Sequence, residues 1–300
     1  MKKYKVLWFD DEFEKLETIK DDALINDILL IGYNNATDGL IELESNLFSY
    51  DAVIVDGKFY TSSANTGDAV DDTAMVKVAR ALDKLEDKKK IPWYILSGQL
   101  SFTKEINPYA TAYKNNKVYD KNKDEHFDEL WAIIKLEADQ QQDTQIRHEN
   151  QDVFSIFSLG YLPKELEQQV LELIKSPVPL TRVEIKAMLA NIRSIHESCL
   201  LKLKEIKVIP NSLEKFSAII KHLSGNKTKE NKYQPTTKEY QNDAIENLNE
   251  WLYFTCGKYI HNLNDENYKG YMISRYAVES LRSGVLELLL WYKKIYQECK

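Results

Sequence analysis

The sequence predicts a doubly wound α/β domain with a five-stranded parallel sheet, followed by an all-helical domain. Within residues 1–138, five short apolar runs alternate with amphipathic helical patterns, as expected of such a sheet. Residues 139–151 are polar, and the chain beyond them shows helical periodicity only. A length of 300 residues suits two domains. We therefore expect domains at 1–138 and 152–300, joined by a linker or a helix extension.

Five segments of the first domain are candidate strands. They are short and rich in β-branched and aromatic residues, which is typical of strands buried on both faces of a parallel sheet. They are Tyr4–Phe9, Ile28–Tyr33, Asp51–Val55, Ile91–Leu96 and Lys117–Tyr119. Helical patterns lie between and after them, near residues 13–25, 37–48, 69–88, 101–106 and 124–138.

The second half has three-to-four apolar spacing with prolines at or near the breaks. The expected helices are 152–175, 181–207, 212–223, 237–261 and 267–298. Residues 225–238 are polar and are expected to form a loop. The last helix is strongly apolar, so its stripe is expected in the core, with dimerisation as the alternative.

Charge and cysteine usage narrow the functional classes. Residues 1–150 carry 19 Lys+Arg against 29 Asp+Glu, and residues 151–300 carry 21 against 18, so the net charge of −7 divides into −10 and +3. Neither half is basic enough to indicate nucleic-acid binding. The three cysteines have no metal-site or disulfide spacing. The chain shows no signal peptide or membrane-length apolar run, so we expect a cytoplasmic protein.

Chemically distinctive side chains follow four of the five strands. Asp10 and Asp11 follow the first strand, Asp56 the third, Ser97 the fourth and Lys121 the fifth. The carboxyl ends of parallel strands open onto one crevice, so these side chains should converge. Three crowded carboxylates suit Mg²⁺, and a hydroxyl and an ammonium can meet phosphoryl oxygens that the metal does not reach. Asp56, on the central strand, is the expected nucleophile.

These segments, KVLWFDDE, DAVIVDGKF, IPWYILSG and VYDK, resemble the response-regulator receiver family over residues 1–138. The resemblance implies a flavodoxin-like sheet of order 2-1-3-4-5, with Asp56 accepting a phosphoryl group from a histidine kinase or phosphotransfer protein. It implies Mg²⁺ held by Asp10, Asp11, Asp56 and the backbone carbonyl of Lys58, with Ser97 and Lys121 on the phosphoryl oxygens. The helical half would be the output domain. Apart from self-phosphorylation and autodephosphorylation, no enzyme activity is implied.

The chain departs from the family pattern at three places. The loop after Asp56 is long, lacks proline and carries Asp68, Asp71 and Asp72, which would lie near the site or cap the next helix. Asn122 follows Lys121, where the family usually has proline. Val118 occupies the usual place of a switch aromatic, and strand alternation should turn Tyr119 to the opposite face.

The helical half contains one segment that suggests chemistry. Residues 257–262, GKYIHN, resemble the Arg and His motif of helical ribonucleases in toxin and phage-defence systems, but Lys258 precedes His261 where an arginine is needed. A histidine at a helix end more often serves as a cap, and Asn262 carries no separate assignment. A receiver-gated ribonuclease is therefore one alternative function. An unphosphorylated scaffold is another, and a homodimer or other protein partner through the helical domain stays open.

Overall fold

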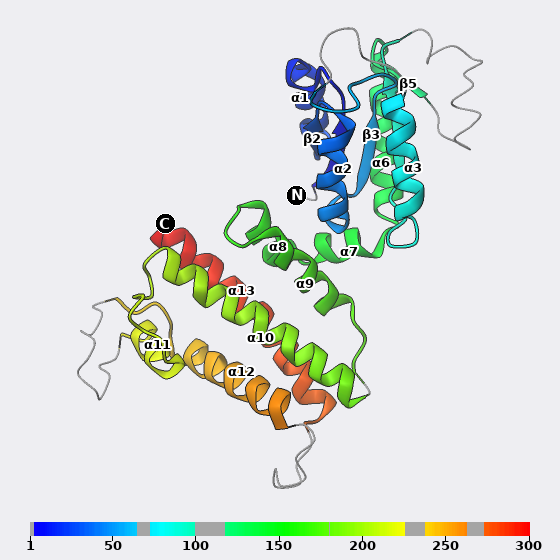
Figure 1. The fold of residues 1–300 in the computed structure, drawn as a ribbon. Helices are drawn as coiled ribbons and strands as arrows, with labels where there is room; N and C mark the ends of the chain where they lie inside the picture. Colours follow the sequence, from blue (N-terminus) through cyan, green and yellow to red (C-terminus); the bar gives the residue numbers. More distant parts are fainter. Residues whose placement is uncertain (1–2, 65–72, 100–117, 180, 226–237, 263–272) are drawn as a thin grey trace. The chain divides into compact units, whose positions relative to one another are not determined.

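A computed structural model describes residues 3–64, 73–99, 118–179, 181–225, 238–262 and 273–300 (Figure 1). The chain divides into two compact units, Met1–Glu149 and Asn150–Lys300. The first contains the sheet and the second is helical.

The first unit is built on a five-stranded, all-parallel sheet of order β2-β1-β3-β4-β5, which confirms the predicted fold class. Strands β1 and β2 have the predicted bounds, β3 begins one residue later than predicted, and β4 and β5 differ from prediction by one or two residues at both ends. The strands are β1 (Tyr4–Phe9), β2 (Ile28–Tyr33), β3 (Ala52–Val55), β4 (Trp93–Ser97) and β5 (Val118–Asp120). All four residues of β3 are buried, as expected of a central strand covered on both faces.

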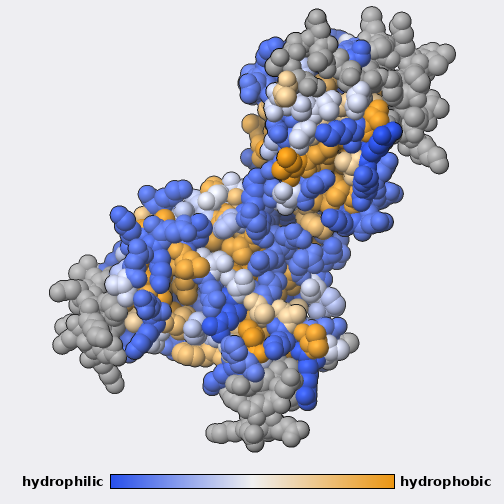
Figure 2. Space-filling view, viewed as in Figure 1, coloured by the Kyte–Doolittle hydropathy of each residue, from blue (hydrophilic) through white to orange (hydrophobic). Residues whose placement is uncertain are grey.

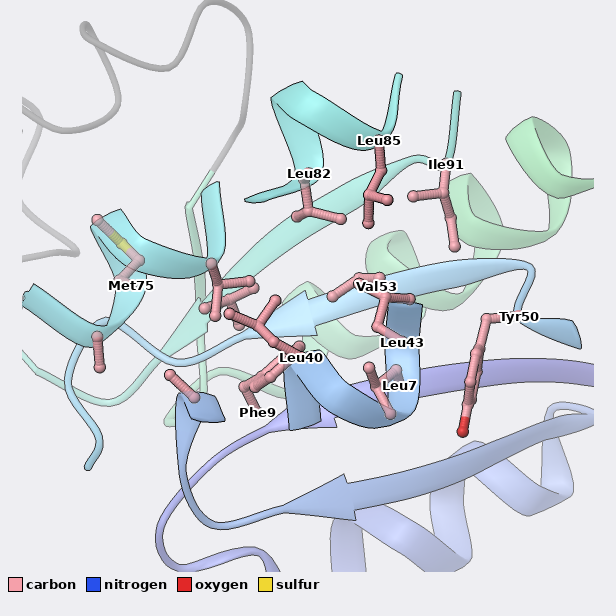
Figure 3. Close-up of a cluster of buried hydrophobic side chains, with 14 of the residues drawn as sticks. Leu7, Phe9, Leu40, Leu43, Tyr50, Val53, Met75, Leu82, Leu85 and Ile91 are labelled. Atoms are coloured by element: carbon pink, nitrogen blue, oxygen red, sulfur yellow. The ribbon is translucent and has the colours of Figure 1, made fainter. Parts of the chain in front are cut away.

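Helices cover both faces of this sheet (Figure 1). On one face, Leu7 and Phe9 of β1 pack with residues of α2 (Ala36–Ser45) and α3 (Thr73–Leu85) (Figure 3). On the other face, Val6 and Trp8 pack with α1 (Glu17–Ile25) and α6 (Asp124–Ala138). Short 3₁₀ turns, Phe13–Lys15 and Leu47–Ser49, complete the described elements before β3. The alternation along β1 therefore divides the core into two layers.

Residues 139–151, the expected linker or helix extension, contain a separate helix, α7 (Gln142–Glu149). α6 ends at Ala138 as predicted. The other helices of this unit begin and end within a few residues of the patterns that predicted them. The predicted helix near 101–106 and the carboxylates Asp68, Asp71 and Asp72 lie outside the described residues.

α7 is held against the sheet by Asp51, the buried residue just before β3. Thr144 donates to Asp51 Oδ1 at 2.5 Å, and Arg147 forms an ion pair with the same oxygen. The backbone N–H of Lys5 donates to Asp51 Oδ2 at 2.7 Å, and Gln141 donates to the Asp51 carbonyl at 2.9 Å. Burial alone would raise the pKa of Asp51, but Arg147 and Lys89 hold it below its usual value. The carboxylate is therefore charged and fully partnered inside the unit.

The second unit contains six described helices: α8 (Gln151–Ser158), α9 (Lys164–Lys175), α10 (Arg182–Glu205), α11 (Phe216–Leu223), α12 (Asp243–Asn262) and α13 (Arg275–Cys299). The single helix predicted over 152–175 was wrong. Gly160 has a φ of +69° and Pro163 precedes α9, so the chain turns between α8 and α9. α10 begins as predicted, with Thr181 and Glu184 forming a reciprocal capping box.

The core of the helical unit lies among α10, α12 and α13. The apolar stripe of α13 is buried there, with Leu281, Val285 and Leu289 almost inaccessible, so its predicted place in the core is confirmed. Tyr276 is the exception and is exposed. Cys199 and Cys256 are buried and Cys299 is partly exposed, and all three are free.

Across the described parts of the chain, no helix is both long and apolar enough to cross a membrane. On the face drawn in Figure 2, hydrophobic residues are interspersed among hydrophilic ones over the helical unit. In the helical unit as a whole, several large apolar side chains are exposed.

Candidate functional site

The register of β1 and β3 brings Asp10 and Asp56 side by side. Phe9 is paired with Val55, and the two aspartates are the next residues of their strands. The backbone continues this alignment, because the N–H of Asp56 donates to the Phe9 carbonyl at 2.9 Å. Carboxylate oxygens of Asp10, Asp11 and Asp56 all lie within 4.8 Å of one another. The expected convergence of these three carboxylates is confirmed.

Lys121 reaches into this cluster from the end of β5. Its Nζ donates to Asp10 Oδ2 at 2.6 Å and to Asp56 Oδ2 at 2.7 Å. The ammonium also lies 5.9 Å from the centroid of the buried Trp8 ring. One cation thus bridges the two buried carboxylates, as the positions of these residues at strand ends predicted.

Backbone amides fix the other oxygen of each bridged carboxylate. The N–H of Glu12 donates to Asp10 Oδ1 at 2.9 Å, and the N–H of Gly57 donates to Asp56 Oδ1 at 2.6 Å. Hydrogen bonds to a carboxylate stabilise its charged form. Asp10 and Asp56 are therefore oriented by the turn that follows each strand as well as by Lys121.

Ser97 lies at the same edge of the sheet, as the last residue of β4. The N–H of Lys121 donates to the Ser97 carbonyl at 3.2 Å, so the residue of β4 and the residue after β5 are adjacent. The Ser97 hydroxyl is buried and accepts from the N–H of Gln99 at 3.4 Å. Lys58 follows Asp56 by two residues and is partly exposed.

Asn122 connects the segments that follow β4 and β5, next to Ser97 and Lys121, a role that the sequence did not reveal. Its side-chain amide donates to the Gly98 carbonyl at 3.2 Å and to Asp120 Oδ1 at 3.0 Å. The backbone N–H of Asn122 donates to the same Asp120 oxygen. In the sequence, this position differed from the receiver family only by the missing proline. The structure shows that the Asn122 amide links the segments after β4 and β5 by hydrogen bonds.

Burial and mutual repulsion shape the protonation of the cluster. Burial, with the nearby Asp56 charge, raises the pKa of Asp10 to about 6 despite the opposing effect of Lys121. Burial also raises the pKa of Asp11. Although burial opposes it, the charges of Asp56 and Asp10 raise the pKa of Lys121. Three carboxylates and one ammonium leave a formal charge of −2, which a divalent cation would neutralise.

The raised pKa of Asp10 predicts a pH dependence of stability in the metal-free protein. The folded form holds this proton more tightly than the unfolded chain, whose Asp pKa is near 3.8. The contribution of Asp10 is therefore full below pH 3.8 and is lost as the pH rises through about 6. We expect the free energy of unfolding to fall by up to about 3 kcal/mol over this range through Asp10 alone.

Urea unfolding in EDTA, followed by circular dichroism between pH 4 and pH 7, measures this effect as the difference between the wild type and Asp10→Asn. In Asp10→Asn, the free energy of unfolding should not show the fall with pH that Asp10 causes. Asp83→Asn, an exposed control on α3, should show the same fall as the wild type. Parallel pH profiles for the wild type and Asp10→Asn would contradict the expected proton linkage.

Val118 and Tyr119 face opposite sides of the sheet, as predicted. Val118 packs against the cluster on the α2 and α3 face. Tyr119 belongs to the opposite cluster, where its ring makes edge contacts with Tyr94 and His126. The aliphatic Val118 therefore occupies the position on β5 where the receiver family usually has a switch aromatic.

In the helical unit, His261 is exposed near the end of α12. An arginine from another helix lies close to the start of this segment. An ideal Cβ placed on Gly257 would lie 2.5 Å from Nη1 of Arg193, so the guanidinium of α10 rests on this glycine, one turn before His261. Arg193 also forms an ion pair with Glu197 at 2.7 Å. The sequence could not reveal this approach, because Arg193 is far from Gly257 along the chain.

The chain matches no known protein-family model, and none of the curated proteins matches it.

Proposed function

We propose that residues 1–138 act as a receiver domain that accepts a phosphoryl group on Asp56 and thereby controls the helical unit. The supporting observation is the convergence of Asp10, Asp11, Asp56 and Lys121 at the carboxyl edge of a parallel sheet of order 2-1-3-4-5. A scaffold would gain nothing from crowding three carboxylates, since like charges at this distance repel one another.

The donor set fits Mg²⁺. Hard divalent cations prefer oxygen ligands, and Mg²⁺ usually takes one or two carboxylates and leaves positions for water and phosphate. Asp10, Asp11 and Asp56 would hold the ion, with the backbone carbonyl of Lys58 as a further ligand. When bound, the ion would neutralise charge on the phosphoryl oxygens.

Asp56 is a better nucleophile than Asp10. Asp10 is fully inaccessible and its raised pKa disfavours the charged form, whereas Asp56 retains some exposure, about 6%. A carboxylate oxygen of Asp56 would attack phosphorus as the bond to the donor breaks, and the leaving group would keep the electron pair. Lys121 and Ser97 would then face the oxygens of the transferred group.

The proposed donor is a histidine kinase or a phosphotransfer protein, which implies a cytoplasmic location. A dianionic group on Asp56 would compete for the Lys121 ammonium, which now pairs with Asp10 and Asp56. Because Asn122 joins the segments that directly follow β4 and β5, movement of Ser97 or Lys121 would change the surface around β5. That surface would pass the signal to the helical unit or to a partner.

Labelling with a small phosphoryl donor tests the proposal. The wild-type chain, incubated with acetyl phosphate and Mg²⁺, should gain the mass of one phosphoryl group, and EDTA should prevent the gain. If the folded chain neither binds Mg²⁺ at millimolar concentration nor accepts the group, the unphosphorylated scaffold is the better description.

A ribonuclease output is a second candidate. It is favoured by the approach of Arg193, on α10, to Gly257, which lies one turn before His261 on α12. A guanidinium and an imidazole together can bind a phosphodiester and transfer protons. Cleavage of single-stranded RNA that is lost in both His261→Ala and Arg193→Ala would support it. Cleavage that survives both substitutions would assign the activity to a contaminant.

A further inference from the structure

One face of α12 is exposed, and it carries two large aromatic side chains. From Asn247 onward, the exposed residues of this helix follow a spacing of four, three, four and three residues. This spacing marks a single stripe along the helix, about 21 Å long. The stripe, called here the α12 seam, consists of Asn247, Trp251, Phe254, Lys258 and His261.

The aromatic part of the α12 seam is large and rigidly supported. Trp251 is 38% exposed and Phe254 is 46% exposed, although both are large apolar side chains. Phe254 makes edge contacts with Phe216 and Tyr253, and these two rings stack on each other at 3.7 Å. The Arg193 guanidinium lies 4.6 Å from the Tyr253 ring. A pre-organised aromatic surface with an arginine at its edge is typical of protein interfaces.

We propose that the α12 seam pairs, antiparallel, with the same seam of a second copy of this chain. The sequence of the seam is complementary to itself about Phe254. A two-fold axis through Phe254 would set Trp251 against Lys258 of the other copy and Asn247 against His261 of the other copy. The ammonium of Lys258 would then lie over an indole ring, which is a favourable cation–π arrangement. Each contact occurs twice, as in any isologous interface.

The direction of pairing follows from the charges. A parallel arrangement would place Lys258 against Lys258 of the other copy, whereas the antiparallel one avoids this repulsion. The α12 seam also contains no carboxylate, so no buried acid would need a partner across the interface.

A second copy fits better than nucleic acid. Aromatic side chains among cations can bind single strands, but such sites lie in strongly basic grooves. Here the Arg193 guanidinium is already neutralised by Glu197, whose side chain is half exposed beside it. The 151–300 half carries a net charge of only +3. The proposal concerns the helical unit alone and does not depend on phosphorylation of Asp56.

The interface would be small, because a single helix seam buries less surface than a standard protein interface. Self-association of the full chain should therefore appear at roughly 1–300 µM. Sedimentation equilibrium over this range should show a monomer–dimer equilibrium in the wild type. Phe254→Glu should weaken it at least tenfold, because the substituted residue meets its own copy and places two carboxylates on the axis.

Leu201→Glu is the matched control, since Leu201 is also an exposed apolar residue but lies on α10 outside the α12 seam. It should leave the dimer unchanged. Far-ultraviolet circular dichroism establishes that both variants are folded. A chain that stays monomeric up to 300 µM, or a dimer that Phe254→Glu leaves intact, would overturn the proposal.

Disulfide trapping tests the register without depending on a destabilising charge. In a Cys299→Ser background, where Cys199 and Cys256 are buried, Phe254→Cys should cross-link to its own copy. A Trp251→Cys chain mixed with a Lys258→Cys chain should form a mixed disulfide, and neither should cross-link alone. Self-cross-linking of Trp251→Cys, or no cross-link from Phe254→Cys, would refute the antiparallel pairing. Binding of a fluorescent single-stranded RNA that Phe254→Glu abolishes, in a monomeric wild type, would assign the α12 seam to nucleic acid instead.

Discussion

Asp56→Asn is expected to abolish phosphoryl labelling, with a loss of at least about 100-fold relative to the wild type. The carboxamide is not a nucleophile at phosphorus, and Asp10, the other carboxylate that Lys121 bridges, is poorly suited to replace Asp56. Asp10 is fully buried, and its pKa is raised to about 6. The substitution nearly preserves the size of the side chain, so the fold should persist.

The measurement is intact-protein mass after exposure to acetyl phosphate and Mg²⁺. Asp83→Asn, which removes an exposed carboxylate from α3, is the control and should be labelled like the wild type. Acid-labile label that persists in Asp56→Asn, mapped by peptide mass to another residue, would remove the acceptor assignment while leaving the fold untouched.

Asp51→Ala is expected to lower the free energy of unfolding of the first unit by about 3–5 kcal/mol, the usual cost of removing one partner of a buried ion pair. The substitution leaves the Arg147 guanidinium, only 11% exposed, without its carboxylate. It also removes the acceptor of the Thr144 hydroxyl and of the Lys5 amide. Lys89, also buried, loses the same favourable charge.

Urea unfolding at pH 7 measures this loss, and hydrogen exchange locates it. Amides of α7 and of the start of β3 should lose protection in Asp51→Ala, whereas those of the helical unit should not. Asp83→Ala should change stability by no more than about 0.5 kcal/mol, as exposed substitutions usually do. A similarly small effect of Asp51→Ala would show that α7 is held by other contacts.

The sequence predicted the sheet and its site well for a physical reason. Strands covered on both faces are largely apolar, so the charged residues that follow them mark where they stop, and the residues directly after β1 and β3 are Asp10 and Asp56. Parallel strands in register place such end residues together. Once the strand ends were predicted, the cluster of Asp10, Asp11 and Asp56 could be predicted as well.

Contacts between distant residues could not be predicted in the same way. Arg147 and Asp51 are separated by 96 residues, and their charges appeared in stretches that looked like a linker and a strand start. The same holds for Arg193 against Gly257, because neither residue carries a periodic pattern that points to the other. The break between α8 and α9 was different. Gly160 and Pro163 were visible signals, and the apolar periodicity on either side concealed them.

The anchoring of α7 determines where this protein can be divided. A fragment that stops at Ala138, where the sheet-covering helices end, would lack Thr144 and Arg147 and would leave the Asp51 carboxylate without its main partners. A fragment that stops at Glu149 would retain them. The smallest autonomous piece that carries Asp56 therefore extends one helix beyond the sheet domain.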